Sequence, residues 1–200
     1  MRQSSIIART LVAIIGFTII GLSIALYVRA DIGSDPFTVL ALGISGKAGI
    51  SVGKANQLNS IVLLLVLLIL DRSKIGLGTL LNALVVGRTM DFFLSIIPSP
   101  SSIAISWLML AVGIVLMGLG VGIYVSADLG QGSIEGVMTT ISSRRGIPIG
   151  PTRIGMDVIA VAAGALLGAA PGPGTLLGAA LTGPVASITI TAMRRLFGGA

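Results

Sequence analysis

Arg88 and Asp91 form a charged pair, three positions apart, within the predominantly apolar stretch of residues 76–97. Residues at this spacing share one face of a helix. A lone charge in the middle of a membrane helix costs at least about 2.5–3.5 kcal/mol, so some partner must offset it. Two interpretations remain open. One is an internal ion pair that holds helices together, and the other is a cationic binding point for an anionic solute, tuned by Asp91.

Asp35 and Glu135 accompany two short segments, about 36–46 and 132–143. At about 1.5 Å per residue, each segment reaches only half-way across a hydrocarbon core of about 30 Å. We therefore expect half-helices or re-entrant segments. Free N–H groups at their N-termini would form an anion site if they point to the bilayer centre. Either carboxylate is also a candidate for binding a proton or a cation.

Two further pairs of polar residues have the spacing of helix neighbours. Asn56 and Asn59 share one face and either hydrogen-bond across helices or line a cavity. Arg153 and Asp157 are four positions apart, which predicts an ion pair near the start of a helix. We expect the second pair to be structural.

The remaining candidates are expected to shape the helices. Asp31 and Asp128 each end a long apolar stretch, and we expect each carboxylate to cap the short helix that follows. Pro184 stands at the repeat position of the arginine in residues 76–97, and it predicts a kink in the last long helix. Tyr27 and Tyr124 stand at the ends of apolar stretches, as residues of an aromatic belt do.

The composition excludes several function classes. The chain has 200 residues, of which 54% are hydrophobic and only 10% charged, so it is no ordinary soluble domain. It has no Cys and no His, which excludes thiolate chemistry, disulfides and His-ligated metals. It also lacks a phosphate-binding loop. The net charge of +6 is scattered along the chain, which disfavours nucleic-acid binding. We expect a lipid bilayer as partner, no metal, no cofactor and no enzyme.

Six predominantly apolar stretches are long enough to cross a membrane as helices. They cover residues 10–28, 52–70, 76–97, 103–125, 152–169 and 174–193. The chain is therefore predicted to be an all-α polytopic membrane protein with one membrane domain, residues 1–200.

An internal repeat divides this domain into residues 10–97 and 103–195. A shift of 97 positions superposes Gly21-Leu22, Tyr27-Val28, Ala30-Asp31 and Gly33 on Gly118-Leu119, Tyr124-Val125, Ala127-Asp128 and Gly130. Each half then holds three spans and one short segment. Because three crossings is an odd number, the halves are predicted to lie in opposite orientations, as inverted repeats do.

The charges predict which side of the membrane each loop faces. With the N-terminus inside, nine of the 13 Lys and Arg residues lie on the inner side: Arg2, Arg9, Arg72, Lys74, Arg144, Arg145, Arg153, Arg194 and Arg195. Only Arg29, Lys47 and Lys54 lie outside. This bias predicts a multi-pass protein of the cytoplasmic membrane with both termini cytoplasmic.

The segments Tyr27-Val28-Arg29-Ala30-Asp31-Ile32-Gly33-Ser34-Asp35-Pro36-Phe37, Gly49-Ile50-Ser51-Val52-Gly53 and Ile75-Gly76-Leu77-Gly78-Thr79-Leu80-Leu81-Asn82 resemble the YczE/YyaS/YitT family of bacterial membrane proteins. The family's Leu-Gly-x-x-Pro-Trp-Asp segment is matched by Gly33, Pro36 and Phe37, with Thr38 in the place of the acid. The resemblance implies an integral membrane protein of transporter type. Some relatives are encoded beside regulators that sense pyridoxal phosphate, which implies a small anionic or vitamin-like solute.

Two functions from different classes remain open. The first is a secondary transporter or solute-binding membrane protein, with alternating access between the repeats and a site of Arg88, Asp91, Asp35, Glu135, Asn56 and Asn59. The second is a non-transporting scaffold or accessory protein that regulates a partner. The small size also makes a homodimer an open alternative.

Overall fold

The computed structural model describes residues 5–197, and in that range all the regular secondary structure is helical. The elements are α1 (Ile6–Ala30), α2 (Pro36–Ala48), α3 (Val52–Leu70), the short 3-10 helix η1 (Arg72–Lys74), α4 (Leu77–Ile96), α5 (Ile103–Ser126), α6 (Ser133–Arg145), α7 (Ile149–Leu166) and α8 (Pro173–Phe197). Six helices, α1, α3, α4, α5, α7 and α8, are long and apolar enough to cross a membrane. The predicted all-helical chain with six candidate spans is confirmed.

Several predicted bounds shift by a few residues because of local caps. Helix α1 begins at Ile6 because the Ser5 hydroxyl accepts a hydrogen bond from the backbone of its first turn. Helix α7 begins at Ile149, three residues before the predicted start, and the positive φ of Gly168, 98°, follows soon after its end. Pro151 lies within the first turn of α7, where a backbone N–H has no acceptor in the helix and its absence costs no hydrogen bond.

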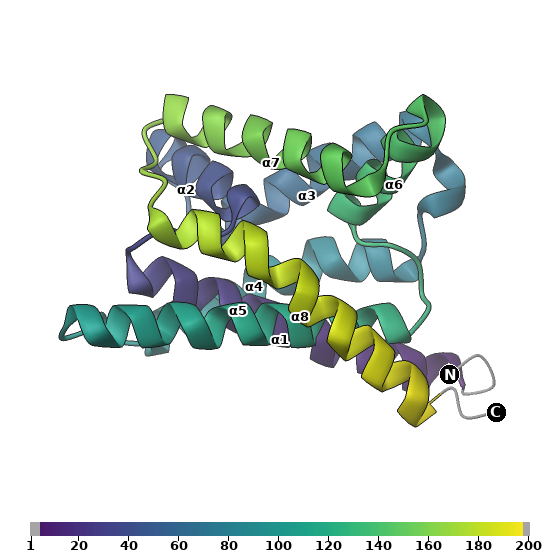
Figure 1. Ribbon diagram of the computed structural model, residues 1–200, viewed down its shortest axis with the longest axis horizontal. Coiled ribbons are helices and arrows are strands. Elements are labelled where there is room, and N and C mark those ends of the chain that lie inside the picture. The colour runs from purple at the N-terminus through teal and green to yellow at the C-terminus, as the bar shows by residue number, and fades with distance from the viewer. Residues whose placement is uncertain (1–4, 198–200) are drawn as a thin grey trace.

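The helices lie in two layers (Figure 1). One contains α1, α4, α5 and α8, and the other contains α2, α3, α6 and α7. The largest buried apolar side chains of the first layer include Phe17, Met90 and Leu110. Many outward-facing residues are also large and apolar, for example Leu166, 87% exposed, and Ile69, 84% exposed. Such a surface suits contact with lipid rather than with water.

The short helices α2 and α6 have 13 residues each. At about 1.5 Å per residue they are about 20 Å long, which is too short to cross a hydrocarbon core of about 30 Å. Helix α2 begins with Asp35 as its N-cap and Pro36 in its first turn, and glycines with φ of 63° and 64°, Gly49 and Gly146, end α2 and α6.

Contacts between the halves recur in pairs at the spacing of the sequence repeat. A Cβ at Gly16 would lie 2.7 Å from the Tyr124 backbone nitrogen, and a Cβ at Gly113 would lie 2.9 Å from the Tyr27 ring. A shift of 97 converts Gly16 into Gly113 and Tyr27 into Tyr124. Each contact therefore becomes the other when the halves are exchanged, which is the property of a two-fold contact.

The loops that lead from one layer to the other also make equivalent hydrogen bonds in the two halves. The Gly78 amide donates to the Leu129 carbonyl at 2.7 Å, and the Gly174 amide donates to the Ile32 carbonyl at 2.8 Å. Gly78 corresponds to Gly174 after a shift of 96, and Ile32 corresponds to Leu129 after a shift of 97, because the second half is one residue shorter before Gly174. The two halves thus share backbone geometry as well as sequence.

The close approach of α1 and α5 predicts the effect of adding one methyl group. In Gly16→Ala the new Cβ meets backbone atoms of α5, and we expect overpacking to cost about 1–3 kcal/mol. In Gly155→Ala, the matched control on α7, the Cβ meets no atom within 4 Å. This change should be neutral or stabilise by up to about 1 kcal/mol. Thermal unfolding in detergent measures both, and equal melting temperatures would contradict the tight crossing.

Candidate functional site

One guanidinium group, that of Arg153 on α7, faces three carboxylates. Its Nε donates to the Asp157 carboxylate at 3.0 Å, as the spacing of four residues predicted. It also lies within electrostatic range of Glu135 and Asp35. We call these four residues the Arg153 cluster. The cluster joins α7 to the first turns of both short helices, which come from opposite halves of the chain.

An aromatic ring completes the surroundings of the guanidinium. The Cζ atom of Arg153 lies 5.9 Å from the centroid of the Phe37 ring, at the distance of a cation–π contact. Phe37 is buried in the first turn of α2. The Arg153 side chain is 35% exposed, whereas that of Asp157 is 12% exposed. The arginine is thus held on two sides and remains accessible on another.

Asp35 occupies the N-terminus of α2 with its own carboxylate. Its Oδ1 accepts a hydrogen bond from the Thr38 amide at 3.2 Å, and the Thr38 hydroxyl donates to Oδ2. Burial raises the pKa of the Asp35 carboxyl, while the Thr38 hydrogen bonds and the charge of Arg153 act in the opposite direction. The free N–H groups that would make an anion site at this terminus therefore already have an anion beside them.

Glu135 lies in the first turn of α6, whose N-cap residue, Gly132, provides no side-chain hydrogen bond. The Oε2 atom of Glu135 lies 2.3 Å from the place a Cβ on Gly132 would take. The Tyr124 hydroxyl lies 3.1 Å from the same place. Only glycine at this position lets the carboxylate fold back over the start of its own helix.

Two buried hydroxyl groups at the starts of the short helices, those of Ser34 and Ser133, have no hydrogen-bond partner among the described residues. The Tyr27 hydroxyl lies beside Thr182, and the Tyr124 hydroxyl lies beside the Glu135 carboxylate. Buried polar groups are nearly always hydrogen-bonded, so the two serine hydroxyls mark unused donor and acceptor capacity.

Tyr27 and Tyr124 correct the expectation of an aromatic belt. They are only 1% and 2% exposed, because the crossing of α1 and α5 covers them. The Tyr124 ring stacks on Phe17 with centroids 4.8 Å apart. Their recurrence after 97 positions was the available signal for a role inside the protein.

Arg88 and Asp91 do not form an ion pair within residues 5–197, so the first of the two interpretations of their spacing is not supported. The Asp91 carboxylate accepts hydrogen bonds from the Ser51 hydroxyl at 2.6 Å and the Gly53 amide at 2.8 Å. It is turned toward the start of α3 and ties α3 to α4. Arg88 lies on the exposed face of α4, in line with the exposed Leu84 and Phe92. The structure does not bring this pair to the Arg153 cluster.

The asparagines on α3 separate into different surroundings. The Asn59 side-chain amide is buried and donates to the Phe37 carbonyl at 3.3 Å. It therefore fixes the first turn of α2, the segment that carries Asp35, against α3. Asn56 is half-buried on the same helix.

The expected caps at Asp31 and Asp128 are also corrected. Both residues have positive φ, 52° and 53°, and Asp35 and Gly132 take the N-cap positions instead. Asp31 itself ends α1 in the left-handed conformation.

Helix α8 continues through Pro184, so the proline does not interrupt it.

The two ends of the α1–α5 pair differ. At one end, Arg9 Nε donates to the Ala127 carbonyl at 2.7 Å, and the guanidinium lies 3.4 Å from the Asp128 carboxylate. A shift of 97 converts Arg9 into Ser106. Ser106 lines an open depression of about 570 Å³ beside Ala30. One end is therefore closed by an arginine, and the equivalent place at the other end is open.

Comparisons with known proteins place these features in a family. Residues 7–191 match the family described as "Family of unknown function (DUF6198)". The chain is 30% identical to an uncharacterized protein of Haemophilus influenzae over 185 residues, 92% of this chain and 84% of that protein. It is also 30% identical to the uncharacterized membrane protein YczE of Bacillus subtilis over 169 residues, 84% of this chain and 79% of that protein. YyaS of the same organism is 32% identical over 124 residues, 60% of this chain and 62% of that protein. No solved structure matches the chain.

The Arg153 cluster predicts a stability difference between two arginines. Arg153→Ala leaves three carboxylates without their guanidinium, and we expect a loss of about 1.5–3 kcal/mol, the range for charged hydrogen bonds. Arg88→Ala, the control, removes an arginine with no ion pair in the described range and should change stability by less than about 0.5 kcal/mol. Melting temperatures in detergent test the pair. A larger loss for Arg88→Ala would contradict the assignment.

Proposed function

The chain belongs to the family of unknown function DUF6198 and is similar to the uncharacterized membrane protein YczE, and on that premise we propose that it is a small secondary transporter or solute-binding membrane protein. The single observation that carries the proposal is the Arg153 cluster, in which α7 and the first turns of both short helices bring four charged groups together. Charged groups inside a membrane protein mark solute and ion pathways. The proposal contains no catalytic step.

The two halves act, in this proposal, as inverted repeats. The paired contacts of α1 with α5 support a two-fold relation between them, because each contact turns into the other on exchange. Each half has three candidate spans, so the two-fold axis lies in the membrane plane. Helices α2 and α6 are then re-entrant segments that enter from opposite sides. With the positive-inside bias, both termini face the cytoplasm and the protein resides in the cytoplasmic membrane.

Alternating access would come from rocking one half against the other. The difference between the two ends of the α1–α5 pair supports this mechanism. Arg9 bridges α1 to the end of α5, whereas the equivalent end beside Ser106 is open. In this proposal the solute enters at the open end beside Ser106, and its release at the other end requires Arg9 to leave Asp128.

The alternative is a scaffold that regulates a membrane partner without transport. Arg88 is the observation that favours it, because a charge on an exposed apolar face of α4 is offset by a partner outside the chain, which includes a second copy in a homodimer. This role does not need exchange between two accessible states, so measurements of accessibility separate it from transport.

Single cysteines at equivalent positions test alternating access, because the chain has no cysteine of its own. Ser34→Cys and Gln131→Cys are related by the shift of 97. In an Arg9→Ala background, we expect maleimide to label Gln131→Cys faster and Ser34→Cys more slowly. For each kcal/mol of stabilisation that the Arg9 bridge gives to the closed end, its removal should change the ratio of the two conformational states about fivefold.

Arg88→Ala serves as the background control and should leave both labelling rates unchanged. An increase at both positions would indicate local loosening, and no change at either position would show that Arg9 does not hold one end closed. Both results contradict the alternating-access proposal.

A further inference from the structure

We infer that the solute is a small organic cation, an ammonium or guanidinium compound, which binds beside Asp35, Glu135 and Phe37. The inference rests on the proposed function and names its substrate class. It differs from the anionic or vitamin-like solute that the sequence and the family resemblance suggested. Of the residues behind that expectation, Arg88 lies on the outer face of α4, and the N-terminus of α2 already has the Asp35 carboxylate beside it.

The charges of the Arg153 cluster favour a cation. Three carboxylates, those of Asp35, Glu135 and Asp157, face one guanidinium. With all four groups ionised, the cluster is negative by two charges; burial raises the pKa of Asp35, and a cation bound beside this carboxyl would lower that pKa again. Excess charge of one sign is costly away from water unless an opposite charge is supplied. A monovalent organic cation reduces the imbalance, whereas an anion increases it.

The helix N-termini do not offer an anion site. Asp35 accepts the Thr38 amide hydrogen at the start of α2, and Glu135 folds back over the start of α6 at Gly132. Helix N-termini attract anions through their unpaired N–H groups and their dipole. Here the chain's own carboxylates already supply the negative charge.

Arg153 shows how a cation is accommodated in these surroundings. Its guanidinium lies 5.9 Å from the Phe37 ring centroid and 3.0 Å from Asp157. A flat aromatic ring with carboxylates beside it is the usual environment for recognising ammonium and guanidinium groups. Glu135 and Asp35 make no ion pair within 4.0 Å in the described range, so they remain available to a second cation.

The unpartnered hydroxyls supply the second, independent observation. Ser34 is 2% exposed, Ser133 is 1% exposed, and neither hydroxyl has a hydrogen-bond partner in the described part of the chain. Ser34 directly precedes Asp35, and Ser133 lies in the same first turn of α6 as Glu135. Hydroxyl oxygens accept hydrogen bonds from N–H donors. An ammonium or guanidinium group has only donors, which matches acceptors of this kind.

The test is a binding measurement on the full-length protein in detergent. Agmatine, butylamine and methylguanidine are compared with butyrate, succinate and phosphate at constant ionic strength, by isothermal titration and by thermal shift. We expect saturable binding of at least one cation and none of the anions. Glu135→Gln and Asp35→Asn should each weaken binding by about tenfold or more, the effect of one charged hydrogen bond.

Asp71→Asn is the matched control, since Asp71 lies in the turn before η1 and its carboxylate bonds only to Ser73 in the described residues. It should leave the affinity unchanged. Should Glu135→Gln fail to fold, Glu135→Asp keeps the charge and shortens the side chain, and the expected loss is again about tenfold.

Three results would overturn the inference. If the wild-type protein bound none of the cations, the inference would be overturned directly. If Asp71→Asn weakened cation binding as much as Glu135→Gln does, the loss of affinity would reflect only the net charge of the protein. Binding of an anion that Arg153→Ala abolishes would refute the cationic class while leaving the transporter proposal intact. The accessibility of Ser34→Cys and Gln131→Cys tests that proposal separately.

Discussion

The partnership of Arg153 with its carboxylates is the interaction on which the arrangement depends. A largely buried guanidinium needs compensating charge nearby. Asp157 pairs with Arg153 directly, and Glu135 and Asp35 lie within electrostatic range of it. Because these acids belong to α7, α6 and α2, their attraction to one guanidinium favours packing of the first turns of both short helices near one long helix. Phe37 adds a contact on the face of the guanidinium. The short helices are too brief to cross a bilayer, so contacts of this kind must hold them in place.

The second feature of the molecule is that equivalent backbone contacts recur in the two halves while the side chains differ. The Gly78 and Gly174 amides donate hydrogen bonds of 2.7 and 2.8 Å to carbonyls at equivalent positions of the repeat. The charges do not follow the repeat, because Asn56 stands at the position equivalent to Arg153, and Ser106 at the position equivalent to Arg9. A binding site for an asymmetric solute, and an end that opens while the other closes, both require this kind of divergence within a shared framework.

Sequence reasoning located the elements better than the partners. The six candidate spans followed from apolar length, and the Arg153–Asp157 pair followed from a spacing of four on one helix. An ion pair between Arg88 and Asp91 does not form in the described residues. Their spacing shows that they share a helix face, but it does not show which helix packs beside them, and Asp91 accepts a hydrogen bond from the Gly53 amide of α3 instead. Tertiary packing likewise buries Tyr27, although its place at the end of an apolar stretch suggested a lipid interface. Only the packing of α7 against the short helices identifies the Arg153 cluster.

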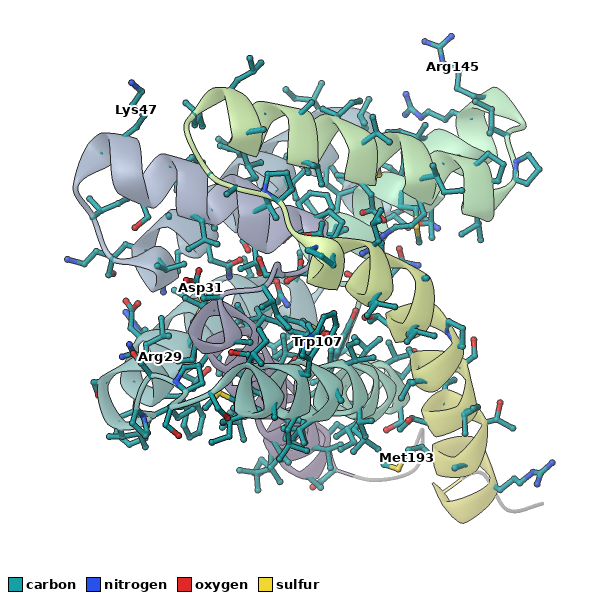
Figure 2. All side chains as sticks on the ribbon, turned by 60° about the vertical axis from the view of Figure 1, so that its left-hand side comes forward. Arg29, Asp31, Lys47, Trp107, Arg145 and Met193 are labelled. Carbon is teal, nitrogen blue, oxygen red and sulfur yellow. The ribbon has the colours of Figure 1, made fainter. Side chains whose placement is uncertain are left out.

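The inverted orientation of the halves is tested most directly by the sides on which two loops lie. Lys47 and Arg145, near the ends of α2 and α6, lie at opposite ends of the layer that contains both helices, and both point away from the body (Figure 2). A membrane-impermeant maleimide is applied to intact cells that carry Lys47→Cys or Arg145→Cys in the cysteine-free chain. The account predicts that Lys47→Cys reacts from outside, whereas Arg145→Cys reacts only after the cells are opened. Reaction of both from the same side would contradict it.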